Sequence, residues 1–150
     1  MKNILVSACL LGTPCRYDGK SKPCEAVLAL PEKFKLIPVC PECEGGLSTP
    51  RVPAERVGDR VLNAEGDDVS AEYERGAIAA WELCRRYGIT SAILKARSPS
   101  CGRGEIYDGS FTRTLTQRDG VAAEHLAVRG VKIYTEDELD IFGREEESDE

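Results

Sequence analysis

Three short apolar runs in the sequence each lead directly to a cysteine. N-I-L-V-S-A precedes Cys9, K-L-I-P-V precedes Cys40, and S-A-I-L-K-A-R-S-P-S precedes Cys101. Short apolar runs bounded by turn residues are typical of buried β-strands. In an open parallel sheet the ends of the strands border one crevice, where α/β proteins bind their ligands. We therefore expect these three thiols, which are distant in the sequence, to meet in space.

The rest of the chain alternates between strand and helix patterns. We expect strands over 3–8, 34–39, 91–95 and 131–134, helices over 24–30, 70–87 and 117–128, and a hairpin where R-V-G-D-R-V-L-N turns. Ser70 is predicted to cap the long helix at its start, and Gly88 is predicted to end it. The resulting β-α-β-α-β-α-β order predicts an α/β fold with right-handed crossovers.

Length and charge restrict the domain organisation and the partners. A chain of 150 residues suits one domain, which we place at 1–143, followed by an acidic tail over 144–150 that we expect to be solvated and flexible. The tail carries five acids and one base, or −4 of the net charge of −6, which leaves −2 for the body. Without a basic surface we expect no nucleic-acid polymer as partner, although a single base or nucleotide remains compatible.

The sequence also indicates a compartment and a redox state. We recognise no cleavable signal pattern at the start and no apolar run near ~18 residues, so we expect a cytoplasmic protein without a membrane segment. The seven cysteines are odd in number, which favours reduced thiols over a disulfide framework. Cys84 lies on the apolar stripe of its predicted helix beside Trp81, so we expect it in the core, and we expect Cys24 to be structural. The ligand candidates lie in turns: Cys9, Cys15, Cys40 and Cys101.

Soft thiolate ligands select iron–sulfur clusters, zinc or copper(I), so a metal cofactor is our first hypothesis. Cys43 forms a C-P-E-C motif with Cys40, a spacing known from zinc sites and redox pairs. Two alternatives therefore stay open. One is a zinc-binding structural module closed by four ligands, including Cys43 or Cys15. The other is a thiol redox protein that uses Cys40 and Cys43 without a metal.

The acid–base chemistry has few candidates. His125 is the only histidine and lies on a predicted amphipathic helix, where we expect a structural role. Acid–base work then falls to a carboxylate or to a metal-bound water, and Glu42 is the candidate carboxylate. Ser98 and Ser100 are placed to donate hydrogen bonds into the crevice. Arginines near the same turns are suited to bind a carboxylate or phosphate, and equally to a surface role: Arg16, Arg51, Arg97 and Arg103.

Five motifs in order resemble the thiouracil desulfidase family, a bacterial family long catalogued as a domain of unknown function. They are S-A-C-L-L-G at 7–12, C-R-Y-D-G at 15–19, C-P-E at 40–42, G-G-L-S-T-P-R at 45–51 and K-A-R-S-P-S-C-G at 95–102. The resemblance covers about 2–140. It implies a Rossmann-like, three-layer α/β fold, in which helices cover both faces of a parallel sheet.

The resemblance also implies an oxygen-sensitive 4Fe-4S cluster that three cysteines hold, with the fourth iron open to substrate sulfur. By motif, the implied ligands are Cys9, Cys40 and Cys101, with Cys15 as the fourth candidate. The sequence departs from the family at Cys43, where we expect an apolar residue.

The activity that the resemblance implies is the non-redox desulfuration of a thiolated pyrimidine, either a thiouracil-type base or a nucleotide. Glu42 matches the family's acid–base residue, and Ser98 matches its hydroxyl partner. Water would replace the sulfur, which leaves as hydrosulfide. We expect a small-molecule substrate and a monomer or small homo-oligomer.

Overall fold

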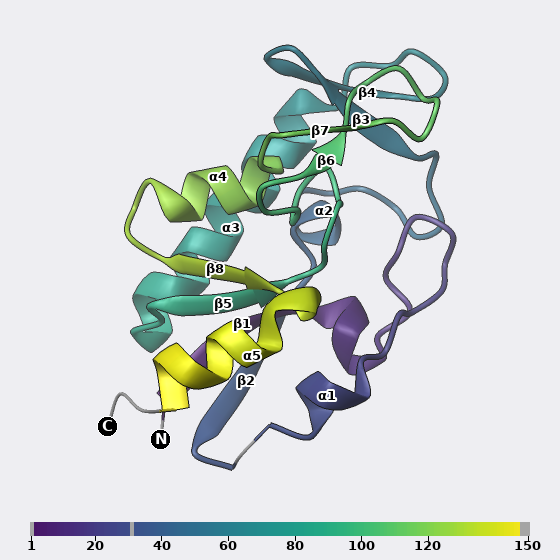
Figure 1. Cartoon of the computed structure of the whole chain (residues 1–150). Helices are drawn as coiled ribbons and strands as arrows, with labels where there is room; N and C mark the ends of the chain where they lie inside the picture. Colours follow the sequence, from purple (N-terminus) through teal and green to yellow (C-terminus); the bar gives the residue numbers. More distant parts are fainter. Residues whose placement is uncertain (1, 31, 148–150) are drawn as a thin grey trace.

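A four-stranded parallel sheet forms the centre of the protein, a computed structural model of which describes residues 2–30 and 32–147. Its strands are β1 (Lys2–Ser7), β2 (Phe34–Val39), β5 (Ser91–Leu94) and β8 (Lys132–Thr135). They lie in the order β2-β1-β5-β8, and all of the pairs are parallel (Figure 1). Ser7 is paired with Val39 and Leu94 with Thr135, so the carboxyl ends of the strands share one edge.

Helices cover both faces of this sheet. Side chains of successive strand residues point to opposite faces, so Leu5 packs on one side while Ile4 and Val6 pack on the other. The first face is covered by α3 (Ser70–Tyr87) and α4 (Val121–Ala127), and the second by α1 (Glu25–Leu28) and α5 (Leu139–Phe142). The predicted three-layer, Rossmann-like α/β fold is confirmed.

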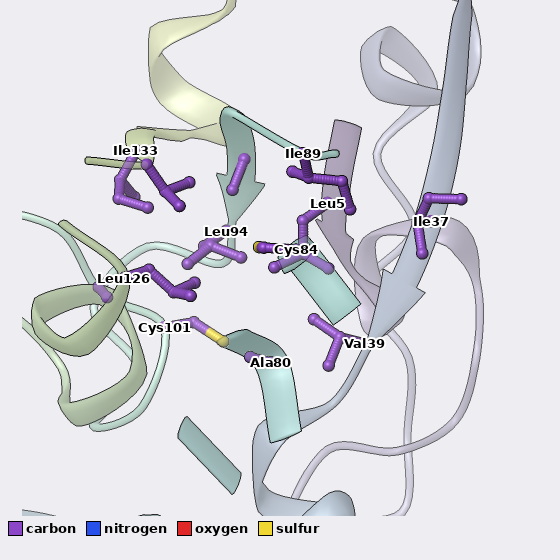
Figure 2. Close-up of a cluster of buried hydrophobic side chains, with 13 residues drawn as sticks. Leu5, Ile37, Val39, Ala80, Cys84, Ile89, Leu94, Cys101, Leu126 and Ile133 are labelled. Atoms are coloured by element: carbon purple, nitrogen blue, oxygen red, sulfur yellow. The ribbon is translucent and has the colours of Figure 1, made fainter. Parts of the chain in front are cut away.

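The core between the sheet and α3 follows the predicted apolar stripe. Ala77, Ala80 and Cys84 are buried, and Trp81 packs half-buried against the same core. Tyr73 of the same stripe is buried in a separate cluster with Val61 and Val69. Figure 2 shows Cys84 among aliphatic side chains from the strands. The helix ends before Gly88, whose φ of 62° is the left-handed conformation that glycine adopts readily.

The predicted capping role of Ser70 is wrong. The helix begins at Ser70 itself, and Val69 occupies the capping position without a side-chain hydrogen bond. The Ser70 hydroxyl instead accepts a hydrogen bond from the Val61 N–H at 2.8 Å. This hydrogen bond joins the start of α3 to the neighbouring hairpin. It could not be predicted from the local sequence pattern around Ser70, because its donor lies nine residues away.

Two small hairpins lie beyond the carboxyl edge of the sheet, beside one another (Figure 1). The predicted hairpin forms from β3 (Ala54–Val57) and β4 (Arg60–Asn63), and the second forms from β6 (Ile106–Tyr107) and β7 (Leu115–Thr116). They touch where a Cβ on Gly109 would lie only 2.6 Å from the Arg56 carbonyl oxygen. The remaining elements are η1 (Ala8–Leu11), α2 (Pro41–Glu44), η2 (Glu136–Glu138) and η3 (Gly143–Glu147).

The chain departs from the sequence prediction at α4 and at the acidic tail. Helix α4 begins at Val121 rather than at 117, because Gly120 packs against the Ser98–Ser100 backbone and precedes the first turn. The solvated tail predicted from Arg144 is wrong for Glu146, which is buried and hydrogen-bonded to Lys2 and Tyr134. Residues 148–150 of the predicted tail lie outside the described residues. Within 2–30 and 32–147, no helix is long and apolar enough to cross a membrane.

Candidate active site

A cavity of about 540 Å³ lies at the carboxyl edge of the sheet, and four free cysteines line it. Cys9 sits in η1 directly after β1, and Cys40 directly follows β2. Cys101 is in the loop after β5, and Cys15 is in the turn after η1. The structure therefore places the four thiols singled out by the sequence on the wall of one space.

The thiols are close enough to influence one another. Burial, and after it negative charge on Cys101 and Cys15, raises the pKa of Cys9 to about 12, against the opposing charges of Lys95 and Arg16. Burial also raises the pKa of Cys40. Such thiols remain protonated at neutral pH unless a cation compensates the thiolate charge. Binding of a metal at these thiols would therefore release their protons.

The backbone of Cys15 contacts both thiols of the C-P-E-C motif. Its carbonyl oxygen accepts hydrogen bonds from the thiol of Cys40, at 3.7 Å, and from that of Cys43, at 3.9 Å. Cys43 does not line the cavity, so within C-P-E-C it is Cys40 that faces this space.

The donors around the cavity are of the kind that an iron–sulfur cluster takes. Four free cysteines line this one space, and in a cluster the thiolates bind different iron atoms. Among the described residues, no group of three His, Cys, Asp or Glu side chains is placed to hold a single metal ion.

Glu42 is held by three donors in the wall of the same cavity. Its Oε1 accepts a hydrogen bond from the Ser100 hydroxyl at 2.9 Å. Its Oε2 accepts from the Tyr73 hydroxyl at 2.9 Å and from Arg51 Nε at 3.2 Å. Only 14% of the Glu42 side chain is exposed. Glu42 is therefore a fixed carboxylate beside the thiols and not a solvated loop charge.

The position of Glu42 depends on the close approach of α2 to α3. A Cβ on Gly76 would lie 1.9 Å from the Pro41 carbonyl oxygen, and one on Gly45 would lie 1.9 Å from the Glu72 carbonyl oxygen. Any larger residue at these two glycines would separate the helices. The contact brings Glu42 within reach of Tyr73, which lies 31 residues away in the sequence.

The two predicted serines have different surroundings. The Ser98 hydroxyl accepts hydrogen bonds from the N–H groups of Ser100 and Cys101, both at 3.1 Å, and shares another with the Ser100 hydroxyl. Ser98 lines the cavity and orders the turn that carries Cys101. The hydroxyl that contacts Glu42 belongs to Ser100, which also lies 3.6 Å from the Cys101 sulfur.

The predicted arginines divide into two groups. Arg16, Arg51 and Arg97 line the cavity, and Arg51 also donates to the Cys15 carbonyl oxygen at 3.0 Å. Arg103 is not among the cavity-lining residues and forms an ion pair with Asp119 at 2.7 Å. Lys95, which the sequence analysis did not select, lines the cavity and is paired with Glu136 at 2.9 Å.

The residues expected to be structural lie away from the cavity. Cys84 is 2% exposed and packs in the core. Cys24 is half-buried against the other core. His125 borders a separate pocket on α4, where burial and then the Arg129 charge lower its pKa.

The fold and the cavity define an α/β protein with a thiol-lined site and a fixed carboxylate, Glu42, beside the thiols. The family model of 2-thiouracil desulfurase matches residues 4–138. This chain belongs to that family, so the resemblance inferred from the five motifs is confirmed.

Two further comparisons agree over nearly the whole chain. A solved structure, the 4Fe-4S-dependent thiouracil desulfidase TudS, is 44% identical, with a TM-score of 0.89 over 96% of this chain and 97% of that chain. A curated relative, "Uncharacterized protein YbbK" of Bacillus subtilis (strain 168), is 38% identical over 146 residues, or 91% of this chain and 97% of the relative.

Proposed function

We propose that this chain is an iron–sulfur-dependent enzyme that replaces the sulfur of a thiolated pyrimidine with oxygen. The observation that carries the proposal is the cavity itself, in which four free thiols and a fixed carboxylate face one space. The family match and the 44% identity to a 4Fe-4S-dependent thiouracil desulfidase support the same chemistry. The substrate is a small thiolated base or nucleotide, and 1–143 act as one domain.

In this proposal Cys9, Cys40 and Cys101 hold a 4Fe-4S cluster, with Cys15 as the fourth candidate ligand. When bound, a cluster with one open iron supplies a Lewis acid for the thiocarbonyl sulfur. The charges of Cys9 and Cys101 act on each other, and the Cys40 thiol donates to the Cys15 carbonyl oxygen at 3.7 Å, so the four candidates lie close together. Ser100, at 3.6 Å from the Cys101 sulfur, links this thiol to the carboxylate.

Glu42 is the base that accepts a proton from water as the water attacks the carbon that bears the sulfur. A carboxylate oxygen has two acceptor positions. Oε2 already accepts from Tyr73 and Arg51, whereas Oε1 accepts from Ser100. The proton therefore goes to Oε1, and Ser98 helps to fix the Ser100 hydroxyl beside it.

The overall reaction needs no electron acceptor or donor. Water supplies the oxygen of the product and two protons, and the C–S bond breaks. Sulfur leaves as hydrosulfide with one of these protons, and the other is released to the solvent. The product is the ordinary oxygen-containing base, which is consistent with salvage or detoxification of thiolated pyrimidines.

Purification of the full chain without oxygen tests this proposal and separates it from its alternatives. We expect a brown protein that contains iron and acid-labile sulfide and converts 4-thiouracil to uracil, with one hydrosulfide released for each uracil. A colourless protein that contains zinc would instead indicate a structural module. A metal-free protein that exchanges disulfides through Cys40 and Cys43 would indicate a redox function.

A further inference from the structure

Three residues with strained backbone line the cavity. In the described part of the chain, the non-glycine residues with positive φ are Arg97 at 65°, Phe111 at 59° and Arg113 at 60°. All three line the cavity. An L-residue in this region costs of order 1–3 kcal/mol, and such residues cluster at active sites and ligand clamps. Two of the three belong to the loop 108–114, which joins β6 to β7.

This loop is fixed in place by Glu55 of β3. The Glu55 Oε1 accepts hydrogen bonds from the N–H of Gly109 at 2.9 Å and from the N–H of Phe111 at 3.1 Å. Gly109 in turn packs so closely on the Arg56 carbonyl that no side chain fits there. The loop is thus attached to the β3–β4 hairpin at two successive points, and its strained conformation is maintained by these contacts.

The strained, clamped loop carries Phe111, which lines the cavity. It is 39% exposed although it is large and apolar, and it lines the same space as Glu42 and the four thiols. Phe111 therefore combines three features: its aromatic ring is exposed, its backbone is strained, and its N–H is held by the Glu55 carboxylate. A core role would explain none of these three features.

We propose that Phe111 is the platform on which the flat ring of the thiolated pyrimidine stacks, and that Glu55 is the residue that positions it. This inference rests on the proposed function, because it assigns the face that recognises the base in that same cavity. An aromatic ring offers a π-face to any planar base and tolerates different ring substituents. Phe111 therefore favours binding of any planar, aromatic thiocarbonyl ring and does not discriminate among thiouracils.

Variants at Phe111 test the platform in the anaerobically prepared holoenzyme. Loss of a base–aromatic stack typically weakens binding by about 5- to 100-fold. We expect Phe111→Ala and Phe111→Leu to raise the KM for 4-thiouracil, and its dissociation constant in equilibrium dialysis, within that range. Phe111→Tyr should stay within about 3-fold of the wild type. The iron content and kcat should change little in all three.

The matched control is Leu115→Ala in the same hairpin. Leu115 is 40% exposed, like Phe111, but it does not line the cavity, so its removal should leave KM unchanged. At Glu55, Gln retains an acceptor oxygen whereas Ala removes it. We therefore expect Glu55→Gln to bind 4-thiouracil nearly normally and Glu55→Ala to reproduce the high KM of Phe111→Ala.

The outcomes separate this inference from the proposed function. Wild-type KM and dialysis values in Phe111→Ala would overturn the stacking role, even if uracil is produced. Equal weakening by Phe111→Ala of 4-thiouracil and of a non-aromatic dihydrothiouracil would also overturn it, because stacking needs the aromatic face. A wild-type holoenzyme that binds 4-thiouracil through Phe111 but releases no uracil would support the platform and refute the proposed desulfuration.

Discussion

The two edges of the sheet each hold a glutamate with several hydrogen-bond donors, Glu42 half-buried and Glu146 buried, but the surroundings of the two differ. At the carboxyl edge, Glu42 is bound by Ser100, Tyr73 and Arg51. At the amino edge, Glu146 is bound by Lys2, the first residue of β1, and by Tyr134. Glu42 faces a cavity with four thiols, whereas Glu146 does not line that cavity.

The comparison shows which features indicate chemistry. Buried and partnered carboxylates occur in structural ion-pair networks as well as in active sites, so burial and pairing alone do not distinguish them. What distinguishes Glu42 is access to a cavity and contact, through Ser100, with a cysteine. We therefore expect changes at the carboxyl edge to lower activity, and changes at the amino edge to lower stability while activity is retained.

The largest expected effect is that of Glu42→Gln on turnover. Glutamine keeps the size of the side chain and some of its hydrogen bonds but removes the base. We expect the rate of uracil release to fall by about 10²- to 10⁴-fold, with full iron content and a cluster spectrum that still responds to 4-thiouracil. Near-normal turnover would place the base elsewhere, and loss of iron would make Glu42 a structural residue.

A second variant, Gly76→Ala, disrupts the packing of α2 on α3 that positions Glu42. In a helix interior, Gly→Ala normally stabilises by roughly 0.5–1 kcal/mol. At Gly76 the added Cβ would lie 1.9 Å from the Pro41 carbonyl oxygen, so α2 must move away from α3. We expect Gly76→Ala to lower the free energy of unfolding by about 1–3 kcal/mol and to lower activity as well. A stabilised and active variant in a urea titration would contradict this packing.

Removal of one donor to Glu42 gives a smaller and more selective change. Tyr73→Phe deletes only the hydroxyl at 2.9 Å from Oε2, and Arg51 still binds the same oxygen. We expect kcat to fall by about 10-fold, since a hydrogen bond to a charged group contributes roughly 1.5–3 kcal/mol. KM and iron content should stay near the wild-type values. An effect on KM alone would mean that Tyr73 contacts the substrate instead.

The smallest expected effect is at the amino edge. Burial raises the pKa of Glu146, but hydrogen bonds from Lys2, Ser91 and Tyr134 lower it, and the result lies below the ordinary value of 4.5. A carboxyl with a depressed folded-state pKa stabilises the protein above its unfolded-state pKa, and this stability is lost as the pH falls through the folded-state value.

Glu146→Gln should therefore lower the free energy of unfolding by about 1–2 kcal/mol at neutral pH. The difference from the wild type should shrink as the pH falls below the ordinary value of 4.5. Uracil release should be unchanged at neutral pH. A constant difference at all pH values in denaturant titrations would show that packing, rather than the charge, is responsible.

The sheet and its cysteines could be predicted because their signals are local. Each strand is a short apolar run, and β2 occupies the predicted 34–39 without any shift. Cys84 could be assigned to the core from the helical spacing of its apolar neighbours. Cys9, Cys40 and Cys101 could be brought together because parallel strands end at one edge.

The partners of Glu42 could not be predicted, because distant segments bring them together. Helix α2 has four residues, too few for a periodic pattern. Tyr73 belongs to the apolar stripe of α3, and nothing near it in the sequence shows that its hydroxyl meets a carboxylate. The burial of Glu146 depends on Lys2, which lies 144 residues away, so a run of acidic residues indicated a solvated tail instead.

The central claim is that the thiols at the carboxyl edge hold an iron–sulfur cluster, and one matched pair of variants tests it most directly. Cys101 and Cys84 lie in the same hydrophobic cluster and are 5% and 2% exposed, but only Cys101 lines the cavity. The measurement is iron and acid-labile sulfide per chain after anaerobic purification of Cys101→Ser and Cys84→Ser. We predict that Cys101→Ser loses most of its iron, because a hard hydroxyl replaces a soft thiolate, and that Cys84→Ser keeps it. Full iron content in Cys101→Ser, or loss of iron in Cys84→Ser alone, would contradict the account.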